Sequence, residues 1–167
     1  MNIRGLLIVV VYIVSSHARE EHELVEVMYI VRANMGYNDD FGIATNCGKS
    51  LISAKWTPKD ITSEGQVTLY ANLTVPYDMN SGYAEADVYN HQDGSIIFQY
   101  GSPFTCEDIQ KFIPCPLQKN EYLSMQRTIT DLSALSQLSG VFDIVVKVSN
   151  EQDQQILCLN ATIAISR

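Results

Sequence analysis

The sequence predicts an all-β fold, a sandwich of about seven strands in two antiparallel sheets. Apolar residues recur with a period of two from residue 47 onward, and polar turn segments separate these runs at the intervals usual for sandwiches. The chain has 167 residues, of which 46% are hydrophobic and 18% charged, enough for one domain with a substantial core. Its net charge of −8 argues against nucleic acid as a partner, because phosphate binding requires a surplus of Lys and Arg.

Residues 1–18 are predicted to be a secretory signal peptide. Arg4 supplies the initial positive charge, residues 5–14 form the apolar run, and Ser16 and Ala18 place small residues before a cleavage site after Ala18. The apolar run is shorter than the roughly 20 residues that a transmembrane helix needs. We therefore expect a protein that is secreted or lies in the endolysosomal lumen.

Residues 19–45 form an N-terminal leader whose structure the sequence leaves open between a short helix, an edge strand and a loose segment. Leu24, Val31 and Met35 have helical spacing, but the segment begins with charges and ends with Gly and Asn. The sandwich domain is expected over residues 46–167.

Within that domain, alternation predicts each strand in turn. Residues 66–75 place apolar side chains on one face and Asn72, the start of an N-glycosylation sequon, on the polar face; a second sequon begins at Asn160. Asp93-Gly94 predicts a tight turn, because this pair tolerates a positive φ. The predicted strands are 49–56, 66–75, 83–90, 95–100, 121–130, 141–149 and 155–165, with a polar hairpin turn at 150–154 and a short helical turn near 107–111.

Four cysteines, Cys47, Cys106, Cys115 and Cys158, follow the predicted signal peptide. An exported chain meets an oxidising compartment, so two disulfides are expected. Spacing alone allows three pairings. The economical one joins Cys106 to Cys115 around a short loop and Cys47 to Cys158 across the domain.

No motif in the sequence predicts catalysis, so we expect no enzyme activity, no metal site and no cofactor. His22 and His91 lack zinc-binding spacing, and Ser139 lacks the glycine pattern of a nucleophile elbow. His91 and Asp93 are predicted to lie in a solvated turn. The acidic turn at 38–40 lacks the further acids of a calcium-binding loop.

The segment 106–120 resembles a known family. Cys106 lies nine residues before a Cys-Pro-Leu step at 115–117, which a Lys-bearing turn and a strand follow. With Asn-Cys-Gly at 46–48, Trp-x-Pro at 56–58, Gly-Val-Phe at 140–142 and the final Cys158 strand, residues 46–165 are similar to the ML lipid-recognition family. That family includes ganglioside activators, Niemann-Pick type C cholesterol-binding proteins and phosphatidylglycerol/phosphatidylinositol transfer proteins, and the four-cysteine pattern looks most like the last branch.

The resemblance implies an immunoglobulin-like β-sandwich whose sheets splay apart, so that lipid tails replace part of the core. It also supports the disulfide pairing given above. Lys111 and Lys119 flank the implied mouth near the short disulfide loop, where they either meet an anionic head group or are ordinary surface charges. The implied lipid-binding residues are Leu69, Val88, Ile96, Phe98, Phe112, Ile113, Phe142, Ile144 and Leu159 in the wall, with Tyr100 and Phe104 at the mouth.

The leading hypothesis is therefore lipid binding and intermembrane lipid transfer, with phosphatidylglycerol or phosphatidylinositol as the first expectation and a sterol as the alternative. A cavity of this kind needs only apolar walls and a few polar atoms, which fits the lack of catalytic motifs. The expected partners are a phospholipid or sterol and, transiently, membrane surfaces, with the protein a monomer. Two other readings are a cofactor that presents lipid to a hydrolase and a solid-core immunoglobulin-like recognition module. The second lacks the usual Cys…Trp…Cys order, since Trp56 is the sole tryptophan.

Overall fold

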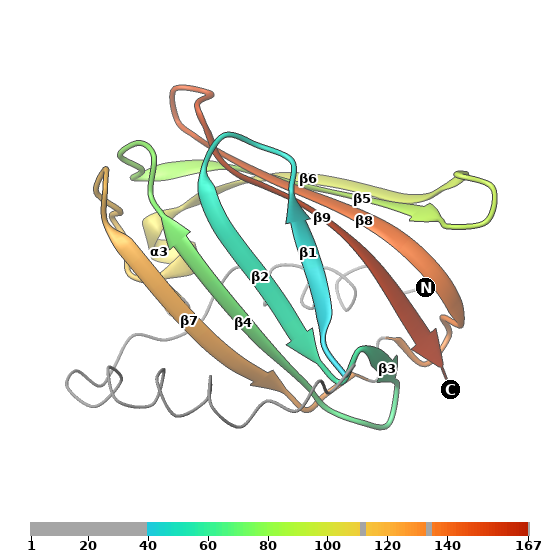
Figure 1. Ribbon diagram of the computed structural model, residues 1–167. Helices are drawn as coiled ribbons and strands as arrows, with labels where there is room; N and C mark the ends of the chain where they lie inside the picture. Colours follow the sequence, from blue (N-terminus) through green and yellow to red (C-terminus); the bar gives the residue numbers. More distant parts are fainter. Residues whose placement is uncertain (1–39, 111–112, 133–134, 167) are drawn as a thin grey trace, which may run out of the picture.

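The computed structural model describes residues 40–110, 113–132 and 135–166. The predicted signal peptide, the leader up to residue 39, Lys111 and Phe112 lie outside the described residues. In the part that is described, no helix is long and apolar enough to cross a membrane. The elements are β1 (Gly42–Asn46), β2 (Leu51–Thr57), β3 (Asp60–Thr62), β4 (Val67–Thr74), β5 (Ser81–Asn90), β6 (Ile96–Thr105), α3 (Cys106–Ile109), β7 (Tyr122–Ile129), β8 (Gly140–Asn150) and β9 (Gln155–Ser166) (Figure 1).

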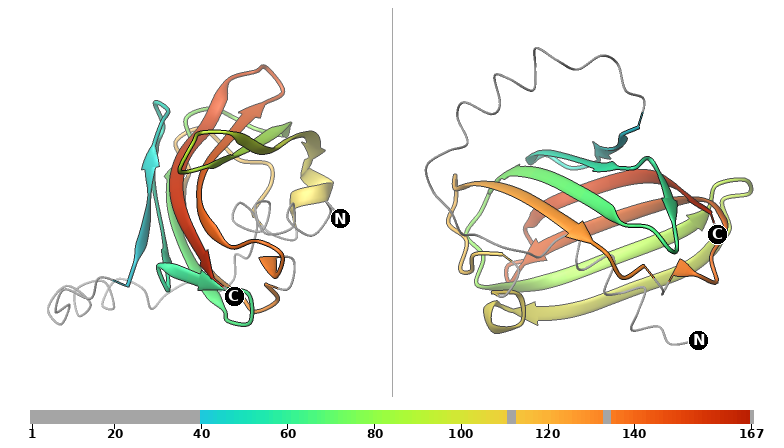
Figure 2. Two further views of the ribbon diagram at one scale, coloured as in Figure 1. Left: turned by 90° about the vertical axis from the view of Figure 1, so that its right-hand side faces the viewer. Right: turned by 90° about the horizontal axis from the view of Figure 1, so that it is seen from below.

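The strands form two layers that share one strand, β1. Its first part, Gly42–Ala44, pairs with β2, and its last residues, Thr45 and Asn46, pair with β9. The strand order is therefore β6-β5-β8-β9-β1-β2-β4-β7, with β3 added in parallel beside β9. We call β2, β4 and β7 the β4 sheet, and β5, β6, β8 and β9 the β8 sheet. The continuous sheet curls round on itself, and β6 and β7 are its two ends (Figures 1 and 2).

The predicted all-β sandwich is confirmed, and every predicted strand is present. Two further strands, β1 and β3, are present beyond the seven predicted ones. β1 includes residues 42–45 of the segment assigned to the leader, for which an edge strand was one of the alternatives left open. Ala44 lines the smaller cavity but Ile43 is 69% exposed, so no run of alternating large apolar residues marks this strand in the sequence. β3 has only three residues, too few for an alternation to be recognised.

β6 continues past the predicted end at Tyr100 to Thr105. Gly101 and Pro103 interrupt the pattern in sequence, but Pro103 lies on β6, an edge strand that pairs only with β5, where its partner is Tyr83. Proline is tolerated on such an edge, because its missing N–H is not needed for a second ladder. The predicted turn before β6 is confirmed, with Gly94 at a φ of 67°.

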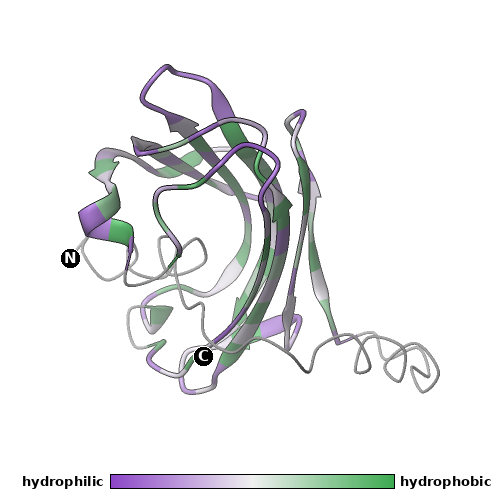
Figure 3. Cartoon of the chain, turned by 90° about the vertical axis from the view of Figure 1, so that its left-hand side faces the viewer, coloured by the Kyte–Doolittle hydropathy of each residue, from purple (hydrophilic) through white to green (hydrophobic). Residues whose placement is uncertain are grey.

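The core lies between the two sheets and divides into two apolar clusters. The first contains Val75, Met79 and Leu117 and lies at the end where α3 and the short disulfide are found. The second contains Trp56 and Leu132 and lies at the β3 end. Bands of apolar and polar residues alternate along the strands in Figure 3, as expected for strands with one buried face.

Both predicted disulfides are present. Cys47–Cys158 joins the segment after β1 to β9 across 111 residues, and Cys106–Cys115 closes a nine-residue separation beside α3. The long bridge fixes the strand shared by the two layers, and the short one fixes the end of the sandwich near α3.

Candidate functional site

A cavity with a volume of about 360 Å³, which we call the larger cavity, lies between the sheets at the α3 end. Both sheets contribute to its wall, and so do α3 and the segment that follows it. The polar residues among its lining are Glu85, Ser102 and Asp108, together with Tyr100. The apolar lining includes Ile52, Leu73, Met79, Ala84, Ala86, Phe98, Phe104, Ile109, Ile113, Leu117, Leu123, Met125, Val146, Val148, Ile156 and Leu157.

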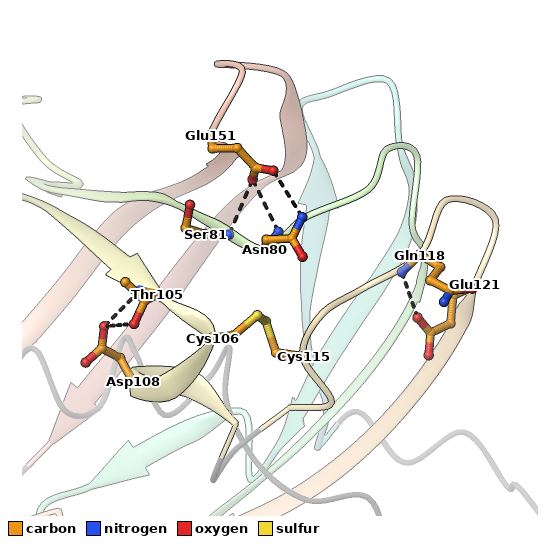
Figure 4. The surroundings of a disulfide bond; sticks show 9 residues. All are labelled: Asn80, Ser81, Thr105, Cys106, Asp108, Cys115, Gln118, Glu121 and Glu151. Carbon is orange, nitrogen blue, oxygen red and sulfur yellow. Dashed lines mark hydrogen bonds between the residues drawn. A yellow bond between two sulfur atoms is a disulfide. The ribbon is translucent and has the colours of Figure 1, made fainter.

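A short helix covers this end of the cavity. The Thr105 amide and hydroxyl both donate to one oxygen of Asp108 at 2.8 Å, which fixes the first turn of α3 (Figure 4). These hydrogen bonds, the amide's first, lower the pKa of Asp108 below its ordinary value. The Cys106–Cys115 bridge joins the start of α3 to the segment that follows it, and Ile113 in that segment is buried in the cavity wall.

The turn at 78–81 is hydrogen-bonded to residues 117–119, in the segment that follows α3. Met79 and Leu117 exchange two backbone hydrogen bonds of 3.0 Å, and both side chains are 2% exposed and line the cavity. The Lys119 amide donates to the Asp78 carboxylate at 2.7 Å. The floor of the cavity is therefore built by loops that hold each other in place.

The β8–β9 hairpin holds the same turn from the other side. Glu151 accepts hydrogen bonds from the amides of Asn80 and Ser81 at 3.2 and 3.3 Å and from the Asn80 side chain at 3.3 Å (Figure 4). Its own backbone N–H, followed by the Asn80 and Ser81 amides, lowers the pKa of Glu151 to about 2. The Asn150 side chain also donates to the Asp78 carbonyl at 2.9 Å. The Glu151 carboxylate and the Asn150 side chain therefore help to hold the 78–81 turn in place at the end of the cavity.

The second, smaller cavity lies between the sheets at the β3 end and has a volume of about 110 Å³. The Trp56 indole forms part of its wall, and its N–H donates to the Lys59 carbonyl at 3.1 Å, so the ring's polar atom is satisfied. Leu135 and Leu138, from the segment before β8, also line it. The other lining residues include Ala44, Ala54, Ile61, Val67, Ala71, Val146, Ala161, Ile163 and Ile165.

The predicted lipid-binding residues divide between the two cavities. Those at the larger cavity are Phe98, Tyr100, Phe104 and Ile113, and those at the smaller cavity are Leu69, Val88, Phe142, Ile144 and Leu159. Lys119 is not among the lining residues of either cavity.

Ile96 was predicted in the wall, but it is 58% exposed and lines neither cavity. The pairing of β5 with β6 shifts at Val88 and Tyr89, where Val88 faces Phe98 and Tyr89 faces Ile96. This irregularity breaks the two-residue alternation, and Ile97 lines the smaller cavity instead.

Several lining residues were missed by the sequence analysis. Ala71, Ala84 and Ala86 lie on the apolar faces that alternation already identifies, so the pattern could have found them. Met79 and Leu117 lie outside the regular strands, where no periodicity marks a buried side chain.

The one histidine in the described residues lies away from both cavities. His91 Nδ1 lies 2.9 Å from an Asp143 carboxylate oxygen, and Thr162 donates to the other oxygen at 2.6 Å. These hydrogen bonds, that from Thr162 first, lower the pKa of Asp143. Asp93 instead accepts from the Ser95 amide and hydroxyl. Across the described ranges, no group of three or more His, Cys, Asp or Glu side chains could hold a metal ion.

Residues 44–165 match the model of the ML domain family. The chain belongs to the ML domain family. Solved structures that share its fold include chicken MD-1 complexed with lipid IVa, with a TM-score of 0.51 and 16% identity; the match covers 74% of this chain and 96% of that one. They also include a Niemann-Pick type C2 protein from the Japanese carpenter ant, with a TM-score of 0.51 and 19% identity, where the match covers 73% of this chain and 98% of that one. A comparison with curated protein sequences found no match.

The family prediction made from the cysteine spacing is therefore confirmed for this ML domain. At such low identities the two solved structures show the shared fold alone. The closer likeness to phosphatidylglycerol/phosphatidylinositol transfer proteins stays a prediction.

Proposed function

We propose that this ML domain binds a lipid in the larger cavity and carries it between membranes. The observation that carries the proposal is an apolar cavity of about 360 Å³ between the two sheets of an ML domain. Ligand-binding pockets commonly have volumes of about 300–1,000 Å³ and mostly apolar walls. MD-1, which has the same fold, was solved with lipid IVa, and this supports a lipid as the ligand here.

The hydrophobic effect is sufficient for such binding. Each acyl methylene removed from water contributes about 0.8 kcal/mol, so a chain of about 16 carbons offers on the order of 12 kcal/mol before costs. Association entropy and ordering of the chain remove part of this. Tyr100, Ser102 and Asp108 supply polar atoms at the cavity for a head group.

The finer proposal is that the ligand is phosphatidylglycerol or phosphatidylinositol, on the strength of the four-cysteine pattern. A sterol is the alternative ligand, because the same fold occurs in a Niemann-Pick type C2 protein. The protein would act without changing any bond of its ligand, as a monomer in the extracellular space or the endolysosomal lumen. The two disulfides favour such an oxidising compartment.

Native mass spectrometry of the protein purified from a eukaryotic secretory host tests the proposal. We expect a bound mass that solvent extraction identifies as one phospholipid or sterol class. A polypeptide mass alone, with no uptake when vesicles that contain phosphatidylglycerol, phosphatidylinositol and a sterol are offered, would refute lipid binding and favour a recognition module.

Transfer between vesicles tests the carrier role separately from binding. With a net charge of −8 the protein is repelled by anionic membranes at neutral pH, and less so when carboxylates are protonated. We expect faster transfer between phosphatidylglycerol-containing vesicles at pH 4.5 than at pH 7. Binding without any transfer at either pH would support lipid presentation to a partner instead.

A further inference from the structure

The two cavities meet at one place in the sandwich. Ala71 of β4 and Val146 of β8 each line both cavities, and they come from opposite sheets (Figure 1). The boundary between the two spaces is therefore set by the side chains at this level of the two sheets.

On the β4 sheet, this level is a row of alanines. The strand registers pair Ala44 with Ala54, Ala54 with Ala71, and Ala71 with Met125. Residues directly opposite in neighbouring strands point to the same face of a sheet. Three adjacent strands thus present only a methyl group toward the β8 sheet, and we call Ala44, Ala54 and Ala71 the alanine row.

The facing level of the β8 sheet includes small side chains as well. Val146 pairs with Ala86 on one side and with Leu159 on the other. Packed sheets are about 10 Å apart, and side chains from both must fill the space between them. Methyl groups on one side and Ala86 and Val146 on the other therefore leave space between the sheets at this level.

We propose that the smaller cavity is a second lobe of the lipid site, reached across the alanine row, and that it takes the end of a long acyl chain. The inference rests on the proposed function. It assigns Ala71 as the residue that sets the chain length the protein accepts, because a larger side chain there closes the passage between the lobes.

The second lobe has room for the end of a chain. Along β4 it runs from Ala71 to Val67, and four residues of a strand span about 13 Å. Its volume of about 110 Å³ is about a third of that of the larger cavity, so it accepts only the last few carbons of a chain. A chain short enough to end in the larger cavity gains no affinity from the second lobe.

The test uses lysophosphatidylcholines from octanoyl to stearoyl, titrated into the lipid-free full-length secreted protein and followed by calorimetry. For the wild-type protein the affinity should rise about fourfold for each added methylene that enters an apolar site. The rise should continue into the longest members of the series. For Ala71→Leu it should stop several methylenes earlier, and the stearoyl member should lose at least tenfold more affinity than the octanoyl member does, because Ala71 lines both cavities.

Two other variants separate the passage from the volume of the site. Ala161 lines the smaller cavity only, so Ala161→Leu should shorten the accepted chain as Ala71→Leu does, and it carries the test if Ala71→Leu does not fold. Ala84 lines the larger cavity only, so Ala84→Leu should weaken every member of the series by a similar factor. All three add the same side-chain volume.

The inference fails if Ala71→Leu and Ala161→Leu keep the chain-length dependence of the wild type, or if the wild-type rise already stops where that of Ala71→Leu does. Both results leave lipid binding itself intact. Lack of binding of every member by the wild-type protein, together with a polypeptide mass alone in native mass spectrometry, would instead refute the proposed function.

Discussion

Replacing Ala86 by leucine distinguishes a true cavity from a core that is closed in solution. Ala86 is 3% exposed, lies in the middle of β5 and lines the larger cavity. A leucine side chain at this position would extend into the space that a lipid tail is proposed to occupy. The sign of the change in stability therefore reports whether that space is empty.

The expected gain in the free energy of unfolding follows from the atoms that the substitution adds. Leucine adds three carbons to alanine, and at about 0.8 kcal/mol for each buried carbon this gives an upper limit of about 2.4 kcal/mol. Fixing the longer side chain costs about 0.5–1 kcal/mol. We expect the lipid-free Ala86→Leu protein to be more stable by about 1–2 kcal/mol, while lipid binding falls.

Urea unfolding of delipidated protein at pH 7 measures this change, with lipid uptake measured on the same samples. Ser124→Leu, on the exposed face of β7, is the control for leucine in a strand and should change stability by less than about 0.5 kcal/mol. If the sheets were closed over a packed core, Ala86→Leu would destabilise the protein by about 1–3 kcal/mol through overpacking. That outcome would refute the cavity and support the recognition module.

Three further predictions concern the frame and the surface. Replacing Cys106 and Cys115 by serine should lower the free energy of unfolding by about 2–3 kcal/mol and weaken lipid binding, as measured by urea unfolding and lipid titration; undiminished binding would show that the short loop does not shape the site. The Glu151 carboxylate stabilises the fold fully above about pH 4.5 and loses that effect as the pH falls toward 2. In Glu151→Gln the free energy of unfolding should therefore fall less steeply between these pH values, and the difference from the wild type should be less than about 1 kcal/mol because the group is exposed. Expression in a eukaryotic host should add glycan mass at Asn72 and Asn160, removed by peptide N-glycosidase, and a peptide map with both asparagines unmodified would contradict this.

The parts of the fold that the sequence predicts are those where one face of a strand is buried. In β4 the alternation places Val67 and Leu73 inside, and the structure agrees. Such a pattern can be recognised within one strand, so it does not require knowing which strands pair with it. The disulfide pairing was predictable for a different reason, because the family pattern and the separations agree.

The site was predicted as one set of residues, and the structure divides it into two. Leu69 and Phe98 were assigned to the same wall, but they lie at different cavities. Which end of the sandwich a residue reaches depends on the register between strands far apart in sequence, and alternation along a strand does not determine that. The loops that carry Met79 and Leu117 are buried through long-range pairing, which leaves no periodic signal.

A cavity in the core has to be compatible with a stable domain, and the two cross-links provide a reason why it is. At about 24 cal/mol for each Å³, an empty space of about 360 Å³ costs at most about 9 kcal/mol relative to a filled core, because this cavity is partly open to solvent. In the chain-entropy model, bridges that close separations of 111 and nine residues contribute together about 7 kcal/mol. The two figures are close, so the cross-links offset most of the cost of leaving the sheets apart. A ligand that fills the larger cavity then removes the cost itself, which gives the lipid-free domain a thermodynamic drive to take up a lipid without any catalytic group.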